Sequence, residues 1–287
     1  VIQERNPRCV VASLSGFGAT GPQAGRASYD IIAQATGGLM SLTGFADGPP
    51  LRGGGALGDF LGGLYLALGI VSGILDRDRR GHGRVLDLSN QDAIFATTDS
   101  AATIFETLGV RSERVGNQHP FAAPYGAFRA TDGWVAIATA SNRLFRRLCE
   151  AMGREELSAD ERFQNHRGRA AHRAQINGIV EDWVSRHTCA EVLSTLGPGG
   201  ADVPCARVSS PDELIEDPQL LHRGMIERHE HPSLGEIVFH GNPLQFSDAL
   251  PRARVLAPRL GEHNREIYAE LGLGDQDLER LAEQKII

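Results

Sequence analysis

One stretch decides the fold: Gly53-Gly54-Gly55-Ala56-Leu57-Gly58-Asp59-Phe60-Leu61-Gly62-Gly63. The apolar run that follows, residues 61–75, predicts a buried core helix. Asp59 then lies at the helix entrance, where free N–H groups and the positive end of the helix dipole keep a carboxylate ionised and nucleophilic. Gly58, Gly62 and Gly63 have no side chains, so a bulky substrate group can come close to that carboxylate.

A second interpretation of the same stretch is purely structural. Asp59 would cap the helix, and the glycines would only let helices pack closely. Spacing alone favours this structural interpretation. The family resemblance described below favours the catalytic one.

Composition narrows the class of protein. A chain of 287 residues can bury a large core, in one large domain or two smaller ones. Its 41% hydrophobic and 23% charged residues are typical of a soluble globular protein. The net charge of -7, without a basic tract, argues against nucleic acid as a partner, and an anionic ligand needs a local basic pocket.

The cysteines and the first residues of the chain give expectations about the cellular location of the protein. The four cysteines contain no C-x-x-C pair, so we predict neither a disulfide framework nor a zinc site, and a reducing cytoplasm is the expected location. No signal peptide opens the chain, which lacks an initiator Met and is expected to start inside a longer protein. Residues 61–75 fall short of the roughly 20 residues of a membrane span, so no membrane partner is expected.

A strand and a glycine-rich loop come first in the chain. Residues 9–15 predict a buried strand of a parallel sheet, and Gly16-Phe17-Gly18-Ala19-Thr20-Gly21 follows as a literal G-x-G-x-x-G. Pro22 and Gly25 prolong the loop, whereas a dinucleotide site needs a helix that begins within the glycine turn, so NAD or FAD is not expected. The loop still leaves the carboxyl end of a strand, where open α/β sheets bind ligands.

Alternating patterns define the fold class as α/β. Helices are predicted at residues 29–40, 61–75 and 90–108, with a strand at 84–89, and Gly69 and Gly73 give the second helix a face for close packing. A Gly/Pro-rich linker, residues 116–124, predicts a domain boundary. A partial Rossmann-like parallel-sheet domain is assigned to residues 1–118 and 236–287, and a smaller α+β domain to 119–235.

The smaller domain and the C-terminal part also have predicted elements. A hairpin is expected at residues 125–129 and 134–139, helices at 144–152 and 163–192, and a strand at 203–208. Asp217-Pro218 is expected to close a helix over 211–219. A last strand at 237–240 and helices at 262–271 and 276–284 complete the prediction.

Two clusters of metal-ligating residue types lack a known ligand spacing. They are an acidic cluster (Asp212, Glu213, Glu216, Asp217) and a histidine cluster (His229, His231, His240). Solvated surface is the better interpretation of both, and no metal is assigned. Ser13 and Ser15 end a strand, but no G-x-S-x-G elbow occurs, which argues against an α/β-hydrolase triad.

Seven segments in one order show that the chain resembles the class III CoA-transferases (CaiB/BaiF type), which include the α-methylacyl-CoA racemases. They are residues 15–22, residues 29–38, Thr43-Gly44-Phe45 with Asp47-Gly48-Pro49-Pro50, Ala56-Leu57-Gly58-Asp59, Gly81-His82-Gly83, Asp217-Pro218-Gln219 with Arg223-Gly224-Met225, and Ala257-Pro258 with Leu260-Gly261-Glu262-His263.

The resemblance implies a catalytic Asp59 whose carboxylate attacks an acyl-CoA thioester, forms a mixed anhydride and then an aspartyl-CoA thioester, before a free carboxylate takes the CoA. Helix-start N–H groups would stabilise the tetrahedral oxyanion. CoA thioester is then substrate, with no permanently bound cofactor, and an interlocked homodimer is expected. Residues implied to contact CoA or substrate are Phe17, Arg26, Tyr29, Gly58, Gly62 and Gly63.

Departures from the family pattern leave alternatives open. Members usually begin with a further strand-helix half that contacts the CoA nucleotide, so a noncatalytic fragment that needs a partner chain is one alternative. A racemase is another, but racemases have a histidine where this chain has Tyr29 and a glutamate near Ser141, and neither substitute is a base near pH 7. Formyl-CoA transferases carry a glycine run that residues 118–121 lack, so the acyl group stays open.

Overall fold

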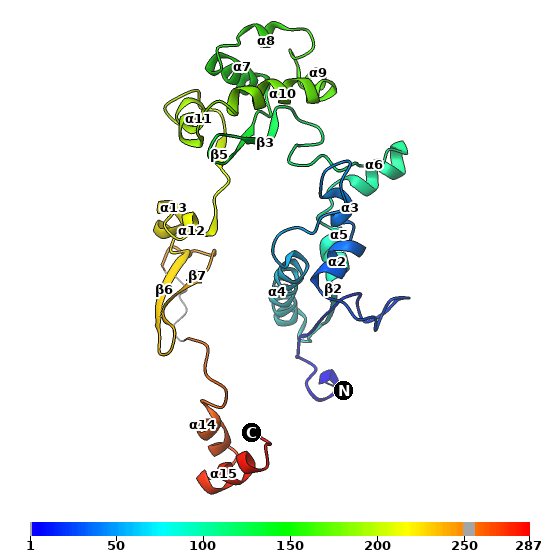
Figure 1. The fold of residues 1–287 in the computed structure, drawn as a ribbon. Helices are drawn as coiled ribbons and strands as arrows, with labels where there is room; N and C mark the ends of the chain where they lie inside the picture. The colour runs from blue at the N-terminus through cyan, green and yellow to red at the C-terminus, as the bar shows by residue number, and fades with distance from the viewer. Residues whose placement is uncertain (1, 249–255) are drawn as a thin grey trace. The chain divides into compact units, whose positions relative to one another are not determined.

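The computed structural model describes residues 2–248 and 256–287, which form two compact units, one up to Val208 and the other Ser209–Ile287 (Figure 1). Parallel and antiparallel sheets both occur, so the chain is of mixed α/β class. The predicted grouping of residues 1–118 with 236–287 stays a prediction, and residues 249–255 of that grouping lie outside the described part.

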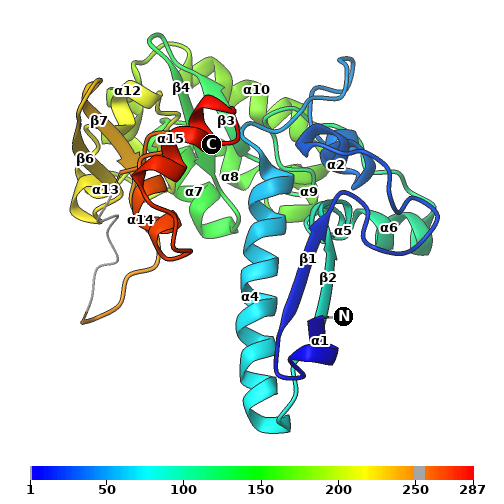
Figure 2. The ribbon, with the colours of Figure 1, turned by 90° about the horizontal axis from the view of Figure 1, so that it is seen from below.

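The first half of unit 1 is a two-stranded parallel sheet with helices. Strands β1 (Val11–Ser15) and β2 (Val85–Ser89) pair in register from Val11↔Val85 to Ser15↔Ser89, which confirms both predicted strands. Helix α4 runs alongside them (Figure 2). The helices here are α1 (Ile2–Arg5), α2 (Asp30–Thr36), α3 (Leu39–Leu42), α4 (Leu57–Arg80), α5 (Asn90–Phe95) and α6 (Ala101–Leu108).

Two of the predicted helices are broken in the structure. Gly38, with φ of 94°, separates α2 from α3, because this left-handed conformation cannot continue a helix. The predicted helix over 90–108 is likewise two helices, α5 and α6, and Asp99 between them has φ of 53°. Both breaks occur where the chain turns. These segments are therefore helical as predicted, but the prediction that each is one continuous helix is wrong.

The second half of unit 1 is an antiparallel sheet covered by helices. The sheet order is β3 (Tyr125–Arg129), β4 (Trp134–Ala138) and β5 (Cys205–Arg207), which confirms the predicted hairpin and strand. The predicted helical stretch over 163–192 is three helices rather than one. The helices are α7 (Asn142–Ala151), α8 (Glu156–Ala159), α9 (His166–Ala171), α10 (Arg173–Val184) and α11 (Cys189–Leu196).

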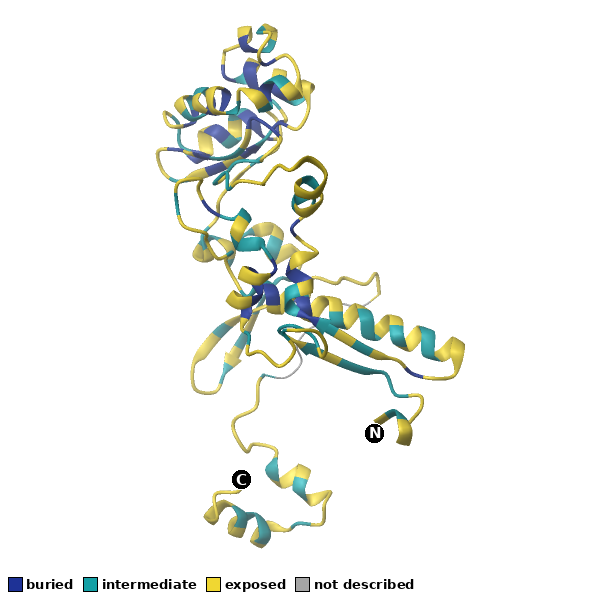
Figure 3. Ribbon diagram, turned by 90° about the vertical axis from the view of Figure 1, so that its right-hand side faces the viewer, coloured by how far each residue is buried: buried dark blue, intermediate teal, exposed yellow. Residues whose placement is uncertain are grey.

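Most of the hydrophobic core lies in this second half. Among the described residues, every buried hydrophobic side chain except Ala33, Ala93 and Ile94 falls between Ala122 and Val203 (Figure 3). Burial raises the pKa of the Cys149 thiol to about 12, so this cysteine is inert core. The parallel-sheet half therefore has little internal core of its own.

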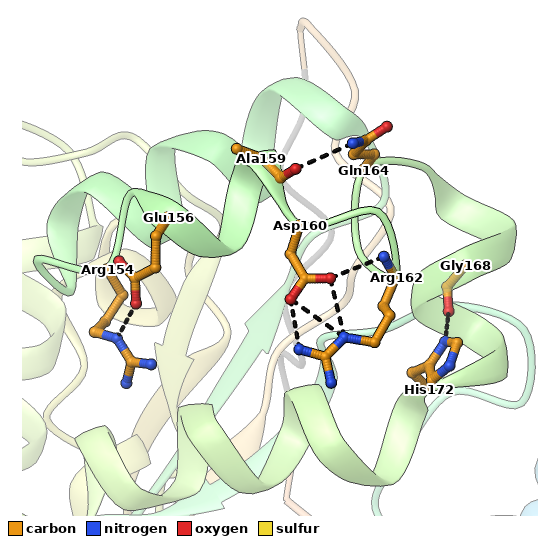
Figure 4. Close-up of polar contacts among 8 residues, drawn as sticks. All are labelled: Arg154, Glu156, Ala159, Asp160, Arg162, Gln164, Gly168 and His172. Atoms are coloured by element: carbon orange, nitrogen blue, oxygen red, sulfur yellow. Dashed lines mark hydrogen bonds and ion pairs between the residues drawn. The ribbon is translucent and has the colours of Figure 1, made fainter.

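A charged turn joins α8 to α9 at the edge of this core (Figure 4). The Asp160 carboxylate accepts hydrogen bonds from the Arg162 guanidinium and from the Arg162 backbone N–H. These contacts, the guanidinium first, lower the pKa of Asp160 to about 2. Asp160 is therefore ionised at neutral pH, and its contacts are those of a surface ion pair rather than a reactive site.

The described residues of unit 2 form a hairpin and four short helices. They are α12 (Pro211–Leu214), α13 (Pro218–His222), β6 (Ile226–His231), β7 (Gly235–His240), α14 (Asn264–Ala269) and α15 (Asp275–Glu283). The prediction of one helix closed by Asp217-Pro218 is wrong, because Asp217 caps α13 and Pro218 begins it. Strand β6, which pairs with the predicted last strand, was not predicted.

Helix α4 is helical as predicted, but it is not buried. Of its 24 residues only Gly58 and Gly62 are buried, and its apolar side chains Phe60, Leu64 and Leu68 are 75%, 67% and 62% exposed. The predicted core helix is therefore wrong in its burial. The helix meets the sheet through its glycine face, which leaves its large apolar side chains uncovered. On this glycine face, a Cβ on Gly69 would lie 2.4 Å from Leu86, and one on Gly73 would lie 3.1 Å from Val10.

The apolar length of α4 exceeds the prediction. Among the described residues, this one helix is long and apolar enough to cross a membrane, by length and composition only. The expectation that the run is too short for a span is thus corrected. Its glycine face lies on β1 and β2, as expected for a helix of an α/β layer.

Candidate active site

Three segments meet at the carboxyl ends of β1 and β2. The loop over residues 16–28 follows β1, and α5 follows β2 directly at Asn90. The carbonyl of Gly16 accepts a hydrogen bond from the Gln91 N–H at 3.2 Å, and the Asn90 side chain reaches Asp59 in the first turn of α4. This edge of a parallel sheet is where α/β proteins bind their ligands.

Asp59 is oriented and open to solvent. It is the third residue of α4, and Ala56 occupies the N-cap position, so the interpretation of Asp59 as an N-cap is wrong. Its Oδ1 accepts a hydrogen bond of 3.0 Å from Asn90 Nδ2. Among the described residues no side chain donates to its Oδ2, and the residue is exposed. One carboxylate oxygen is therefore held while the other is accessible.

Asp30, at the start of α2, holds the approach to Asp59. It is 8% exposed, and its Oδ1 accepts the Gly58 N–H at 2.8 Å. Its Oδ2 accepts from Gln34 at 2.9 Å and from Arg52 Nε at 3.1 Å. Gln34 in turn accepts the Gly53 N–H at 2.9 Å. Asp30 and Gln34 thus tie both ends of the glycine-rich segment to α2.

The charge of Asp30 is set by these contacts. Burial on its own would raise the pKa of Asp30, but the hydrogen bonds from Gly58, Gln34 and Arg52 outweigh burial and lower the pKa below its ordinary value. Asp30 is therefore a carboxylate at the positive end of α4. Because it accepts the Gly58 N–H, that one group is not free to stabilise an oxyanion. The expected role of the other helix-start N–H groups stays a prediction.

Sequence reasoning placed Asp30 only in the first turn of a helix and gave Asn90 no role. The Asp30/Gln34 pair has the i, i+4 spacing that allows contact on one helix face, and this is the signal that predicts their hydrogen bond. Asn90 follows a strand that ends at the sheet edge, where polar residues gather at ligand sites.

The glycine-rich loop is a loop throughout, as predicted, with no helix between β1 and α2. Asp87 of β2 fixes it, because its Oδ2 accepts the Ala19 N–H at 2.9 Å. Gly18 has φ of 85°, and a Cβ there would lie 3.3 Å from the same oxygen. The structure brings Phe17 and Arg26 together, with the guanidinium 5.2 Å from the ring centroid.

The other predicted contact residues differ in their surroundings. Tyr29 is the N-cap residue of α2 and is 82% exposed. Gly58 and Gly62 are buried, and a Cβ on Gly58 would lie 3.1 Å from the Ala33 side chain, so protein packing explains the lack of a side chain at both positions. Gly63 instead faces open space, because no atom lies within 4 Å of the position that a Cβ would occupy. Contacts of these residues with substrate stay predictions.

Gly63→Ala tests whether the open position serves a ligand. Because nothing obstructs the new methyl group in an exposed helix, the free energy of unfolding should rise by about 0.5–1 kcal/mol. If substrate passes this point, activity falls while stability rises. Urea unfolding measures the first effect, and Gly69→Ala, which would clash with Leu86, is the matched control with the opposite sign. Reduced stability of the Gly63 variant would contradict the packing described here.

In each of the two clusters that resemble metal sites, one member contacts a side chain from outside the cluster. Arg228 bridges Glu216 and Glu236 at 2.6 and 2.9 Å, and His229 lies 3.2 Å from Glu227. In the described part of the chain no group of three or more His, Cys, Asp or Glu side chains is arranged to hold a metal ion.

Comparison with known proteins decides the family. The family model described as CoA-transferase family III matches residues 1–264. The chain belongs to this family. The resemblance drawn from the seven sequence segments is thereby confirmed.

Relatives in CoA-transferase family III cover most of the chain. The succinyl-CoA–D-citramalate CoA-transferase of Chloroflexus aurantiacus is 34% identical over 98% of this chain and 70% of its own length. The acetyl-CoA:oxalate CoA-transferase of Acetobacter aceti is 35% identical over 92% of this chain and 67% of its own. A crystal structure of a CaiB/BaiF family protein from Brucella suis matches with a TM-score of 0.78 and 33% identity, over 94% of this chain and 70% of that chain.

Proposed function

We propose that this protein transfers CoA from an acyl-CoA donor to a free carboxylic acid, with Asp59 as the nucleophile. The observation that carries the proposal is an exposed carboxylate, held through one oxygen by Asn90, at the ligand-binding edge of a parallel sheet. Its membership of CoA-transferase family III and two relatives named for CoA transfer to an acid support the reaction class.

The proposed reaction begins at Asp59 Oδ2. This oxygen attacks the thioester carbonyl of the donor, the C–S bond breaks with its electron pair on sulfur, and a mixed anhydride forms. The CoA thiolate then attacks Cγ of Asp59, the donor acid leaves as a carboxylate, and an aspartyl-CoA thioester remains. No proton needs to be moved in these steps.

The second half returns CoA to the acceptor. The acceptor carboxylate attacks Cγ, the thiolate leaves, and a new anhydride joins Asp59 to the acceptor. The thiolate attacks the acceptor carbonyl, and Asp59 leaves as a carboxylate. Each step needs the reacting atoms held in near-attack positions, and the fixed backbone before Asp59 supplies such positioning.

CoA itself carries phosphates, which a chain of net charge -7 must bind through local cations. Arg26 is such a cation, because it is exposed in the loop that leaves β1. Phe17 stacks with its guanidinium and fixes its direction. We assign these two residues, with Tyr29, to the contact with CoA or the acyl group, and CoA acts as substrate rather than as a resident cofactor.

A racemase is less well supported, because it needs bases on both faces of the substrate α-carbon. Tyr29 is exposed and unpaired with any described base, and Ser141 Oγ already caps α7 by accepting the Leu144 N–H at 3.2 Å. Incubation with an (R)-2-methylacyl-CoA in deuterated water distinguishes the two reactions. We expect no exchange at the α-carbon, and α-deuterium incorporation would establish the racemase.

The reaction class is tested with a panel of acyl-CoA donors and free carboxylic acids, read by mass spectrometry. We expect a new acyl-CoA to appear only when both substrates are present, in an amount equal to the donor consumed. Hydrolysis without a new thioester, or CoA binding without turnover, would favour the noncatalytic alternative. The protein should be produced with its whole natural sequence.

We also propose that the protein forms a homodimer, because the exposed apolar face of α4 needs a second copy of the chain to pack against it. Leu64, Leu68 and Val71 lie on this face and are more than half exposed. Leu68→Lys should therefore shift the protein from dimer toward monomer in sedimentation velocity. Leu234→Lys, at a similarly exposed leucine in unit 2, is the control and should leave the dimer intact. A wild-type monomer that binds no hydrophobic dye would contradict the proposal.

A further inference from the structure

Asn90 has a hydrogen-bonding pattern that stability does not explain. Its Nδ2 donates to Asp59 Oδ1 at 3.0 Å, while its own Oδ1 is buried and receives no hydrogen bond from any described residue. A buried carbonyl oxygen without a donor destabilises a fold. Turning the amide over would bring its oxygen against the Asp59 carboxylate instead, so the carboxylate fixes the amide orientation.

Gly62 makes room for this arrangement. It lies close to Asp59 on α4, and a Cβ there would be 2.2 Å from Asn90 Oδ1. Any larger residue at this position would displace the Asn90 side chain from Asp59. The backbone around Asn90 is also fixed, because Ser89 Oγ caps α5 by accepting the Asp92 N–H at 3.0 Å. The chain thus keeps both a helix glycine and an unpartnered amide oxygen to maintain one contact.

We infer that Asn90 is the oxyanion donor for the steps in which Cγ of Asp59 is attacked, an inference that rests on the proposed function. When the anhydride forms through Oδ2, Oδ1 becomes its carbonyl oxygen. When the CoA thiolate or the acceptor carboxylate then attacks Cγ, negative charge develops on Oδ1. The Asn90 amide already lies at hydrogen-bond distance from this atom and needs no rearrangement.

Under this inference, Asn90 affects some reaction steps and not others. Attack of Asp59 on the donor thioester puts charge on the donor oxygen, which Asn90 does not contact. A hydrogen bond to Oδ1 also withdraws electron density from the attacking carboxylate. Asn90 therefore accelerates the steps at Cγ and not the first step. Gly58 cannot take its place, because its N–H donates to Asp30.

Asn90→Ala in the complete natural protein tests this separation. We expect kcat to fall about 10²-fold, the size of effect found when one oxyanion donor is removed, with an unchanged KM for the acyl-CoA donor. Rapid acid quench followed by mass spectrometry of the intact protein distinguishes an added acyl group from an added CoA. It should show that the first anhydride still forms at the wild-type rate and that the aspartyl-CoA thioester forms slowly. Thermal stability should not fall, because the variant removes a buried oxygen that lacks a donor.

Two control variants are compared with Asn90→Ala. Asn90→Asp keeps the shape, lacks the donor and places a second negative charge beside Asp59, so it should lose more activity than Asn90→Ala. Gln91→Ala removes the neighbouring amide, which donates to the Thr36 carbonyl instead of Asp59, and should leave both partial steps at the wild-type rate.

A double-mutant cycle with Gly62 tests the same contact from the other side. Gly62→Ala should lower kcat in the wild-type background by displacing Asn90, and it should lower kcat little further in Asn90→Ala. Wild-type turnover of Asn90→Ala, equal slowing of both partial steps, or additive effects in the cycle would each overturn the inference. Full activity of an Asp59 variant would instead overturn the proposed function itself, so the two failures are distinguishable.

Discussion

Asp59→Asn should reduce CoA transfer to background, by roughly 10⁴-fold or more, because it removes the atom that carries the acyl group and then CoA. Folding and CoA binding should survive the change. Asp59 is exposed, its neighbour Asn90 can still donate to the remaining amide oxygen, and no buried group loses its partner. The measurement is the initial rate of acyl-CoA formation, with CoA binding followed separately by calorimetry.

The covalent intermediate gives this prediction a direct readout. Wild-type protein incubated with acyl-CoA and hydroxylamine should yield an aspartyl hydroxamate at Asp59, located by peptide mass spectrometry. Asp92→Asn is a matched control, because Asp92 occupies the same third position of its helix, α5, and is also exposed. An adduct on Asp30 or Asp47, or normal turnover of Asp59→Asn, would show that the nucleophile is misassigned.

Local patterns in the sequence predict the elements that carry this site. An acid after a glycine-rich run and before an apolar run is visible within a dozen residues, and so is the strand before the G-x-G-x-x-G loop. The strands β1 and β2 and the helix that begins near Asp59 follow from such patterns. Their ends are less predictable, because a cap such as Asp217 and a break such as Gly38 depend on backbone conformation.

The contacts that organise the site are not local. Asp30 meets Gly58 across 28 residues of sequence, and Asn90 meets Asp59 across 31. No periodicity reports such a pairing, because it depends on how α2, α4 and α5 pack. The burial of α4 was mispredicted for a related reason. An apolar run indicates that the side chains of a helix need to pack against something, but it does not indicate which chain or segment they pack against.

The glycines show the same limit. The space beside Gly58 and Gly62 is filled by protein atoms, from Ala33 and Asn90 respectively, while their predicted contacts with substrate stay predictions. Some glycines leave space for a ligand and others leave space for a neighbouring side chain. Sequence alone cannot distinguish the two, because in both cases a Cβ would be in the way. Of the three, Gly63 alone faces open space among the described residues.

Asp30→Ala should destabilise the protein by about 2 kcal/mol and lower its activity as well. The substitution leaves the buried Gly58 N–H and Gln34 amide, and the more exposed Arg52 guanidinium, without their shared acceptor. Because Asp59 is the residue after Gly58, loosening this contact also misplaces the nucleophile. Asp47→Asn, at an exposed acid of the same half of unit 1, should change neither property. Urea unfolding followed by circular dichroism measures the stability.

The pH dependence of this loss has a definite sign. The hydrogen bonds to Asp30 lower its pKa in the folded state, so its ionised form stabilises folding at every pH above the unfolded value of about 3.9. That contribution disappears as the pH falls through the lower folded-state pKa. The stability difference between wild type and Asp30→Ala should therefore be constant from pH 7 to about pH 5 and shrink below about pH 4. A difference that grew on acidification would mean that Asp30 is protonated in the folded protein, and its proposed role as the anion that anchors the start of α4 would then fail.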